Sequence, residues 1–572
     1  MGLFDIIIFF GFIAAVLAVG MIKSKGAGSA SSEAGADDYF LAGRGLSWWL
    51  IGFSLIAANI SAEQFVGMSG QGAGLEGLSC ASWEWIAAIA LVVVAFALLP
   101  YFLKTGITTI PEFLEVRYNH WARTIMTVSM MAILIVASLI GVTYAGSLVM
   151  HQLFQAIGWT HIPFWGCCLL MGLMAGGYVL FGGLKACAWA DLLQGSALIV
   201  GGAVIAYFAI KALGSAESVM GWSRDAAGAL QSAPQAASGD GWLATFKAAN
   251  AVKLEMGRPA TDTAMPWTIL LVGIWIPNFY YWGLNQYITQ RILGSGSLAE
   301  GQKGLVLAAG LKLLIPFIIV IPGIIAFNLF AKELAVDTAV SASGYKFDGA
   351  LGLLITKLIP KNVGILGFVL AALLGAIVSS LAAVLNATST LLTMDIYQRY
   401  VNRKADAHAL VSFGRLSIAV LMVIGIVVSS LLKADSIFAY IQKVQLYVSP
   451  GVVAVFIFGL INRRGARWIG VAGLIISPIL YALFTSGVLS GLQKVLPLTL
   501  GGQVPEMHYL WAASYTLILT LVAMFVMGAF CKEEQPVTFE TNTKLDLSTS
   551  KSALIAGLVV VAITVALYVI FW

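Results

Sequence analysis

The chain has 572 residues, of which 60% are hydrophobic and 10% are charged, whereas an ordinary soluble protein carries about 25% charged residues. So little charge cannot cover a surface that faces water, which excludes a soluble enzyme, a disulfide-linked secreted domain and a disordered protein. The net charge of +5 does not indicate a nucleic-acid partner, because the lysines and arginines are dispersed between apolar segments. The composition predicts an all-α polytopic membrane protein whose surroundings are the lipid bilayer.

A helix needs about 20 apolar residues to cross the bilayer core. The segments that meet this requirement are 3–22, 46–70, 82–104, 124–149, 162–183, 189–210, 266–289, 304–330, 363–396, 412–432, 437–461, 466–488, 508–530 and 553–571. Lys23 and Lys25 follow the first segment instead of preceding it, so this segment is predicted to be a retained helix and not a cleaved signal peptide. The chain is therefore predicted to cross the membrane about fourteen times.

The distribution of lysine and arginine predicts the orientation. If the N-terminus lies outside, the short cytoplasmic connections hold nineteen of these residues, and the short external ones hold only Lys433 and Lys494. Two longer external loops, 211–265 and 331–362, hold nine more, but long loops count little under the positive-inside rule. Both termini are therefore predicted to lie outside.

The span 46–70 carries polar residues in its middle, where lipid would not tolerate them. They are Asn59, Ser61, Glu63 and Gln64, and several glycines follow. A helix break at membrane depth is tolerated only where it lines a cavity enclosed by protein. This second span is therefore predicted to be discontinuous and to face such a cavity.

The span 266–289 has the same character. Pro277 removes a backbone donor, and Asn278, Asn285 and Gln286 add polar groups. This seventh span lies five spans after the second, so each of the two would open one of two five-helix halves. Interrupted segments at matching positions of two halves are typical of the binding site of a transporter with an inverted repeat.

Lys312 lies within the apolar span 304–330. A charge at the centre of a membrane helix costs roughly 2.5–3.5 kcal/mol on insertion scales, so Lys312 is expected to face a cavity or an opposite charge. Glu84, near the start of the third span, could supply that charge. The alternative is that Lys312 reaches the membrane interface, because it lies only about eight residues into its span.

Four further polar residues have open interpretations. Ser379 and Ser380 in the ninth span either pack against a neighbouring helix or bind a monovalent cation together with carbonyl groups freed by the broken helix. Asp191, at the start of the sixth span, is either a helix cap or part of a cation path. Gln442, early in the eleventh span, is a candidate for a buried polar contact.

Five segments carry a resemblance to a known family: DDYFLAGRGLSWW, SLIAANISAEQFVGMSG, TIPEFLEVRYN, NFYYWGLNQYITQR and AIVSSLAAVLNATSTLLTMDIY. They resemble the sodium/solute symporters, in the sodium/glucose-cotransporter branch, and are most similar to bacterial sodium/galactose symporters. The likeness runs from about residue 37 to about residue 460. It implies a LeuT-like core of five plus five helices at 46–461, preceded by an extra helix and cytoplasmic linker at 1–45 and followed by three helices at 462–572.

The resemblance implies roles for the residues that match the motifs of the family. Those implied to bind sodium are Ala57, Ile60 and Ala376 through their carbonyl groups and Ser379 and Ser380 through their hydroxyl groups, with Asp191 on the sodium exit route. Those implied to bind the sugar are Gln64, Glu84, Asn278, Lys312 and Gln442. Those implied to form gates are Asn59, Met68, Trp83, Tyr281, Trp282 and Phe438, where Tyr281 would stack on the sugar and be held by Asn59 and Trp282.

Two positions depart from the galactose-type pattern. Trp83 stands where that pattern has tyrosine, and Ala87 stands where it has serine. The missing hydroxyl group at Ala87 removes one sugar contact. The class of transporter is therefore expected to hold, while the preferred sugar stays open.

The predicted function is sodium-coupled import of a hexose such as galactose or glucose across a bacterial inner membrane by alternating access. One sodium ion per sugar is expected, because the sequence contains the elements of one sodium site. Neither a catalytic residue nor an organic cofactor is expected, since the scattered cysteines and histidines form no nucleophile–base or metal motif. The alternative keeps the fold and the sodium coupling and changes the solute to inositol, sialic acid or an amino acid. A channel is disfavoured, because paired broken helices indicate gated access.

Overall fold

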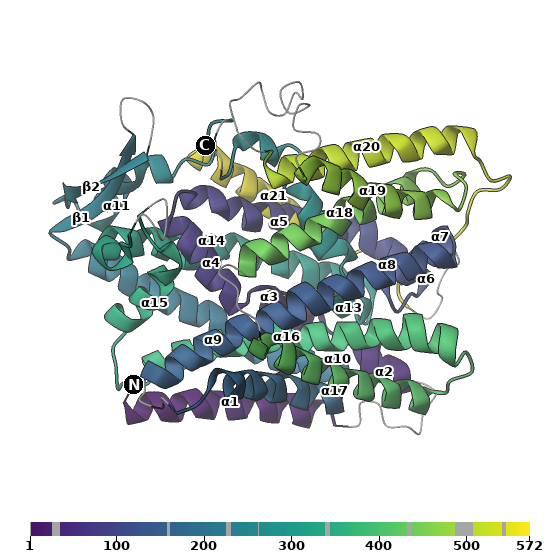
Figure 1. The fold of residues 1–572 in the computed structure, drawn as a ribbon, viewed down its shortest axis with the longest axis horizontal. Helices are drawn as coiled ribbons and strands as arrows, with labels where there is room; N and C mark the ends of the chain where they lie inside the picture. The colour runs from purple at the N-terminus through teal and green to yellow at the C-terminus, as the bar shows by residue number, and fades with distance from the viewer. Residues whose placement is uncertain are drawn as a thin grey trace.

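The computed structural model describes residues 2–25, 35–156, 159, 161–224, 230–260, 262, 264–337, 344–431, 437–486, 507–539 and 545–572. The described chain is mostly helical, and the strands in it form one antiparallel hairpin of β1 (Ser218–Arg224) and β2 (Leu230–Ala236). The long helices run side by side across the view in Figure 1, with the hairpin and α11 (Trp242–Asn250) at one end and α7 (Ile110–Arg117) at the other. These are called the hairpin end and the α7 end below.

The first broken span lies near the N-terminus. The elements there are α1 (Leu3–Lys23), α2 (Gly35–Leu41), η1 (Ala42–Arg44), α3 (Trp48–Asn59) and α4 (Ala62–Ala73). Two of them, α3 and α4, together have the length and hydropathy of one span but are bent by 64° at their junction. The junction residue Ser61 caps α4, because its hydroxyl oxygen accepts a hydrogen bond from the backbone amide of Gln64 at 3.4 Å. The polar residues in the middle of this span thus start a second helix.

Two long helical segments follow, and each contains a π-helical turn. Their elements are η2 (Gly77–Ala81), α5 (Ser82–Val93), η3 (Val94–Leu98) and α6 (Leu99–Thr105), then α7, α8 (His120–Ala132), η4 (Ile133–Leu139) and α9 (Ile140–Ala156). The π-helical turns are η3 and η4. Asn119 caps α8 by accepting a hydrogen bond from the Ala122 amide at 3.0 Å.

Helix α10 (Phe164–Gly214) contains both the fifth and the sixth predicted spans. Its regular geometry is interrupted at Gly183, which has a φ of 53° and a ψ of −144°. A side chain there would be strained, and its Cβ atom would lie 2.2 Å from the carbonyl oxygen of Tyr39. Gly183 therefore lets the chain change direction between the two spans while α10 stays against the segment that contains α2.

The seventh predicted span consists of short pieces instead of one long helix. After η5 (Ala251–Lys253), the pieces are η6 (Trp267–Leu270), α12 (Trp275–Phe279), the π-helical η7 (Tyr280–Leu284) and α13 (Gln286–Leu293). At Asn285 the backbone is extended, and the side chain of Asn285 accepts a hydrogen bond from the Tyr287 amide at 3.4 Å, which starts α13.

The rest of the chain adds long helices and a few short helical pieces around this centre. They are α14 (Leu298–Leu334), η8 (Phe347–Gly349), α15 (Ala350–Leu353), η9 (Leu354–Leu358), α16 (Ile365–Thr390), η10 (Leu391–Val401), α17 (Ala407–Leu431), α18 (Ile437–Ile461), α19 (Ile469–Thr485), α20 (Tyr509–Phe530) and α21 (Lys551–Phe571). In its most apolar window, the segment of α16 and η10 is 89% buried, whereas α21 is 17% buried and presents most of its surface outward. Helix α16 is therefore central, and α21 lies at the periphery.

Within the described residues, ten helices are long and apolar enough to cross a membrane, and the bent pair of α3 and α4 would make an eleventh. The predicted count of fourteen is not reached by this measure and stays a prediction. Three physical reasons account for the difference: α10 counts once although two predicted spans lie in it, the seventh span is divided into short pieces, and α19 is a shorter apolar helix of 17 residues.

Helices α14 and α10 make most of the contacts at the centre of the molecule. Helix α14 packs against α3, α4, α5 and α10, and α10 packs in turn against α3 and α16. The approach of α14 to α4 is very close, because a Cβ atom at Gly323 would lie 2.2 Å from the Ser69 carbonyl oxygen. These contacts hold the break between α3 and α4 against the middle of α14 and α16, where the charged and hydroxyl side chains of those helices lie.

Candidate functional site

A cavity lies between the two broken spans. Most of the residues that the family resemblance implies to bind sugar or form gates contribute to its lining: Asn59, Gln64, Met68, Trp83, Glu84, Asn278, Tyr281, Trp282 and Lys312, together with Ser380 of the implied sodium site. These residues come from α3, α4, α5, α12, η7, α14 and α16. The two interruptions therefore border one cavity, although they are more than 200 residues apart in sequence.

A buried ion pair lies at one side of this cavity. The Lys312 ammonium group lies 2.5 Å from Glu84 Oε2, and the two side chains are 1% and 3% exposed. Lys312 also donates a hydrogen bond to Asn59 Oδ1 and lies over the Trp282 ring, 4.9 Å from its centre. Gln64 Nε2 donates to Glu84 Oε1 at 2.6 Å. The alternative in which Lys312 reaches the membrane interface is therefore wrong, because its charge is enclosed by protein and neutralised by Glu84.

An aromatic group forms another part of the lining. Tyr281 and Trp282 lie in η7, where a π-helical turn follows Pro277, and their rings pack edge to face with centroids 5.1 Å apart. Asn59 Nδ2 donates a hydrogen bond to the Tyr281 hydroxyl oxygen at 3.0 Å. The Tyr281 hydroxyl also contacts that of Tyr287. The half-buried ring of Tyr281 thus borders the cavity and is tied to both broken spans, and its role as a gate stays a prediction.

The residues implied to bind sodium lie together where α3 ends against α16. Ala57, Ile60, Ala376, Ser379 and Ser380 are all buried. The Ser380 hydroxyl donates a hydrogen bond to the Ala58 carbonyl oxygen at 2.9 Å, which joins α16 to the last turn of α3. The end of a helix leaves its last carbonyl groups without donors from the same helix. This part of the structure therefore concentrates oxygen atoms, as the binding of a hard monovalent cation requires.

Asp191 does not cap a helix, which corrects one of the two sequence interpretations. It lies eight positions after Gly183, inside the second part of α10. Its carboxylate is fully buried and lies 2.9 Å from Arg291 Nη2 in an ion pair. It accepts further hydrogen bonds from Ser54 and Ser379, both at 2.5 Å. A position inside a helix has no free amide groups to cap, so the carboxylate instead serves these side chains.

Several functional candidates are missing from the sequence prediction. The cavity is also lined by Ala58, Ser61, Ser138, Val142, Pro277, Tyr287, Val384 and Gln445. Gln445 of α18 and Ser138 of the π-helical η4 add an amide and a hydroxyl group to its polar lining. Gln445 stands one helical turn after Gln442, so the polar stripe of this helix is a signal that could have identified it. Nothing in the sequence marks Ser138, because a π-helical turn leaves no motif.

Two predicted residues lie among positions whose side chains are outside the described part of the structure. They are Gln442, implied to bind the sugar, and Phe438, implied to form the outer gate. Both roles stay predictions. Gln445 lies in the same helix, and its side chain is described and 7% exposed.

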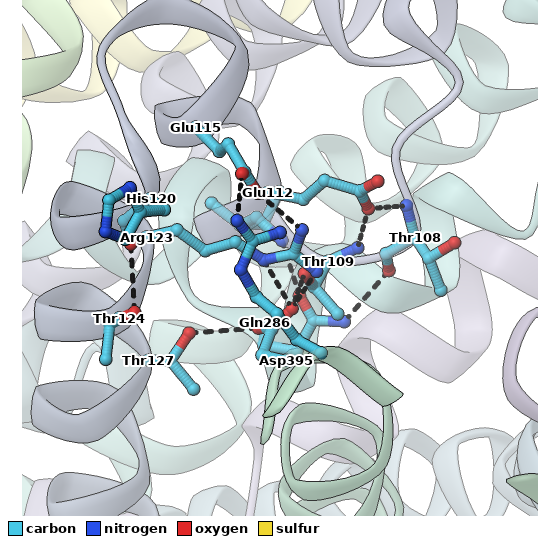
Figure 2. Close-up of polar contacts among 12 residues, drawn as sticks. Thr108, Thr109, Glu112, Glu115, His120, Arg123, Thr124, Thr127, Gln286 and Asp395 are labelled. Atoms are coloured by element: carbon cyan, nitrogen blue, oxygen red, sulfur yellow. Dashed lines mark hydrogen bonds and ion pairs between the residues drawn. The ribbon is translucent and has the colours of Figure 1, made fainter. Parts of the chain in front are cut away.

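A second polar cluster lies towards the α7 end (Figure 2). Asp395 of η10 is buried and forms an ion pair with Arg123 of α8. The carboxylate also accepts hydrogen bonds from Thr109 at 2.8 Å and Thr127 at 3.0 Å. Gln286, the first residue of α13, accepts a hydrogen bond from the Ile110 amide at 2.9 Å. The cluster therefore ties α7 both to η10 and to the inner piece of the broken seventh span.

Charged side chains are also buried at the hairpin end, outside the apolar spans. Lys253 is fully buried, and its ammonium group lies over the Trp222 ring, 4.3 Å from the ring centre. Burial, reinforced by the nearby Arg258 guanidinium, lowers the pKa of Lys253 to about 7. Arg258 forms its own ion pair with Asp262, with Nη2 and Oδ2 2.6 Å apart.

Comparisons with known proteins show which family and which fold this chain resembles. The family model described as "Sodium:solute symporter family" matches residues 39–476. A sodium/glucose cotransporter of Vibrio parahaemolyticus is 35% identical, over 99% of this chain and 98% of the relative. A sodium/myo-inositol cotransporter of Canis lupus familiaris is 28% identical, over 91% of this chain and 74% of the relative. Among solved structures, the substrate-bound outward-open state of a Na+-coupled sialic acid symporter covers 93% of this chain and is itself covered completely, at 21% identity and a TM-score of 0.71, which shows a shared fold.

Proposed function

We propose that this chain, which belongs to the sodium:solute symporter family, couples the entry of sodium to the import of a neutral hexose such as galactose or glucose. The observation that carries the choice of a neutral solute is the ion pair of Lys312 and Glu84 at the cavity. Each charge is compensated by the other, so the pair presents hydrogen-bonding groups without a net charge. An anionic solute would need an excess of cationic groups.

The chemistry of the remaining lining supports a sugar. A pyranose offers hydroxyl groups around its rim and an apolar face. The carboxamides of Gln64, Asn278 and Gln445 line the cavity and can donate to and accept from such a rim. Tyr281 and Trp282 supply aromatic surface for the apolar face. A pocket that joins a few placed polar groups to aromatic surface is typical of a small-molecule site.

The sodium site is proposed at the junction of α3 and α16. Its ligands would be the carbonyl groups of Ala57, Ile60 and Ala376 and the hydroxyl groups of Ser379 and Ser380. The break after Asn59 supports this assignment, because unwound backbone supplies carbonyl oxygens for Na⁺ in transporters with broken helices. Sodium bound there would fasten α3 to α16 and preorganise Asn59 and Gln64 for the sugar. The same coupling makes sodium bind more tightly when sugar is present, since linkage is reciprocal.

The topology proposed for this function has fourteen spans and a core of five plus five helices in an inverted repeat. Both termini would lie outside the cell, with the hairpin end external and the α7 end in the cytoplasm of a bacterium. The positive-inside rule supports this orientation, because Arg123 and Arg399 both lie at the α7 end, where each forms an ion pair with Glu115. The outer gate would then be formed by Met68, Trp83 and Phe438, and the inner gate by Tyr281.

The single proposed sodium site would give one sodium ion per sugar in each cycle of alternating access. One sodium ion that enters down a potential of about 100 mV and a tenfold gradient releases roughly 3.7 kcal/mol. This energy supports an accumulation of sugar on the order of several hundredfold. The alternative solute is myo-inositol, which is also a neutral polyol and is the solute after which one relative is named.

Uptake into proteoliposomes tests the proposal. Labelled galactose and glucose are offered with and without an inward sodium gradient, and at least one of them is expected to accumulate only with the gradient. Gln64→Ala should abolish this uptake, because Gln64 lines the cavity and holds Glu84. Gln155→Ala is the matched control, since Gln155 is exposed on α9. Uptake that ignores sodium would contradict the symport mechanism. Sodium-driven uptake of myo-inositol, without uptake of galactose or glucose, would show that the solute is myo-inositol and not a hexose.

A further inference from the structure

Four buried polar side chains meet beside the expected sodium site, and each comes from a different helix. They are Ser54 of α3, Asp191 of α10, Arg291 of α13 and Ser379 of α16. Helix α3 is the first part of one broken span, and α13 is the last part of the other. The group therefore joins both interruptions to α10 and α16, outside the sugar cavity.

The hydrogen bonds of Asp191 are divided between its two oxygen atoms. Oδ2 accepts from Ser54 Oγ at 2.5 Å and from Arg291 Nη2 at 2.9 Å, while Oδ1 accepts from Ser379 Oγ at 2.5 Å. The guanidinium group of Arg291 also donates through Nε to Ser54 Oγ and through Nη1 to the Tyr287 carbonyl oxygen, both at 2.6 Å. Arg291 is thus held in one orientation by three acceptors.

These contacts fix the direction of the Ser379 hydroxyl group. A serine hydroxyl has one proton and two acceptor lone pairs, and an ionised carboxylate can only accept. Ser379 therefore donates its hydroxyl proton to Asp191, and the lone pairs of its oxygen stay available to a cation. Ser380 reaches the same state by donating its proton to the Ala58 carbonyl oxygen. Asp191 thus prepares Ser379 as a sodium ligand from one hydrogen bond away.

If Asp191 had no cationic partner, its carboxylate, one hydrogen bond away from Ser379, would also attract the sodium ion itself. Arg291 neutralises Asp191 at 2.9 Å, so the carboxylate can orient Ser379 without adding its full charge to the site. Both partners of the pair are at most 1% exposed, so water does little to screen their charges.

We propose that Arg291 is a positioning residue of sodium coupling: it compensates Asp191 so that the carboxylate orients Ser379 while sodium affinity stays low enough for the ion to be released. This inference rests on the proposed function, since it presupposes that sodium binds at Ser379 and Ser380. It assigns to the Arg291–Asp191 pair the control of sodium affinity, a role that a merely structural ion pair would not have.

Two substitutions then change sodium affinity in opposite directions. Arg291→Gln leaves Asp191 uncompensated beside the site and is expected to tighten sodium binding about tenfold or more, the order that a unit charge within several ångströms produces at an effective dielectric constant of about 20. It also slows sodium dissociation. Asp191→Asn leaves the Arg291 charge uncompensated and replaces one of the two acceptor oxygens by an NH2 donor, so Ser54, Ser379 and Arg291 compete for one oxygen and sodium binding weakens by a similar factor. Arg291→Lys shifts sodium affinity in the same direction as Arg291→Gln, because an ammonium group cannot donate to all three acceptors. The shift is smaller, because lysine keeps the positive charge.

The test measures binding of ²²Na⁺ to the purified full-length protein, with choline chloride keeping the ionic strength constant. Size-exclusion profiles select the variants that fold, and Arg291→Lys replaces Arg291→Gln if the latter does not. Arg258→Gln is the matched control, because Arg258 is also a buried, ion-paired arginine but lies at the hairpin end. Opposite shifts for the Arg291 and Asp191 variants, with an unchanged control, support the inference.

Two outcomes overturn it, and they are distinguishable. If the unchanged protein binds sodium but both variants weaken binding, or Arg291→Gln leaves it unaltered, the pair is structural and the inference fails alone. If the unchanged protein binds no sodium, the proposed symport fails and the inference fails with it.

Discussion

Replacing Glu84 by glutamine would leave the Lys312 charge at the cavity without its counter-charge. The substitution keeps the shape of the side chain, and Lys312 keeps its hydrogen bond to Asn59. What it removes is the carboxylate that lies 2.5 Å from the ammonium group and 2.6 Å from Gln64 Nε2. The cavity changes from neutral to a net positive charge with almost no change of volume.

The size of the effect follows from Coulomb's law. A carboxylate on a sugar about 5 Å from the uncompensated ammonium group gains about 3 kcal/mol at an effective dielectric constant of about 20. This energy corresponds to a change of about a hundredfold in relative affinity. Glu84→Gln is therefore expected to shift the preference from galactose towards galacturonate by about this factor. Neutral sugar binds more weakly as well, because hydrogen bonds to charged groups contribute about 1.5–3 kcal/mol each.

The assay is competition in proteoliposomes, with galacturonate as inhibitor of sodium-driven galactose uptake. The double variant Glu84→Gln/Lys312→Met restores neutrality and should not respond to galacturonate. The stability of each variant is followed by its unfolding temperature in detergent, since breaking a buried ion pair costs about 3–5 kcal/mol. A folded Glu84→Gln protein that discriminates the two sugars as the unchanged protein does would refute the claim that this pair sets the charge preference.

Three further predictions concern the sodium site and the two ends of the molecule. Ser380→Ala removes one expected ligand and should raise the sodium concentration for half-maximal uptake by about tenfold, as the loss of 1–2 kcal/mol implies; an unchanged sodium dependence would remove Ser380 from the site. Asp395→Asn leaves Arg123 buried without its charge partner and should destabilise the protein by about 3–5 kcal/mol, which the added Arg123→Gln should partly restore; thermal unfolding in detergent measures both. Because burial lowers the pKa of Lys253 to about 7, the unfolded chain holds the Lys253 proton to higher pH than the folded protein does, so stability should rise as pH increases from about 7 towards 10. Lys253→Met should flatten that rise, and an equal rise in both proteins would contradict the assignment.

The sequence predicts best the positions of polar and charged residues inside membrane spans, because exposing them to lipid is costly. Lys312 stands in an apolar span, so it needs an opposite charge inside the protein, and Glu84 provides it. The polar residues of the second and seventh spans follow the same logic, because backbone freed by a break must face a protein cavity. The cavity between α4, α5, η7 and α14 is therefore accessible to reasoning from residue types and span order.

The sequence predicts less well where the local helix geometry decides. Asp191 resembles a helix cap only if the sixth span begins at that residue, whereas the helix runs on from Gly183. Arg291 belongs to the charges of a predicted short connection, yet it is 1% exposed because Asp191 lies opposite. Ser138 reaches the cavity from a π-helical turn, which sequence periodicity does not predict, whereas Gln445 lies one helical turn after Gln442 and could have been found from that spacing.

The enclosure of α16 limits how the molecule can change shape. Helices α1, α3, α9, α10 and α17 surround it, and a close-packed helix cannot slide past one neighbour without opening a gap against another. Under the proposed alternating access, the movement that exposes the cavity to one side or the other would therefore take place around α16, with this helix as the stationary element. Ser379 and Ser380 lie on that helix, and the end of α3 faces them. A bound ion would then report and stabilise the position of a moving helix end relative to a fixed one, and backbone amides of α16 should be among the slowest in the protein to exchange with deuterium.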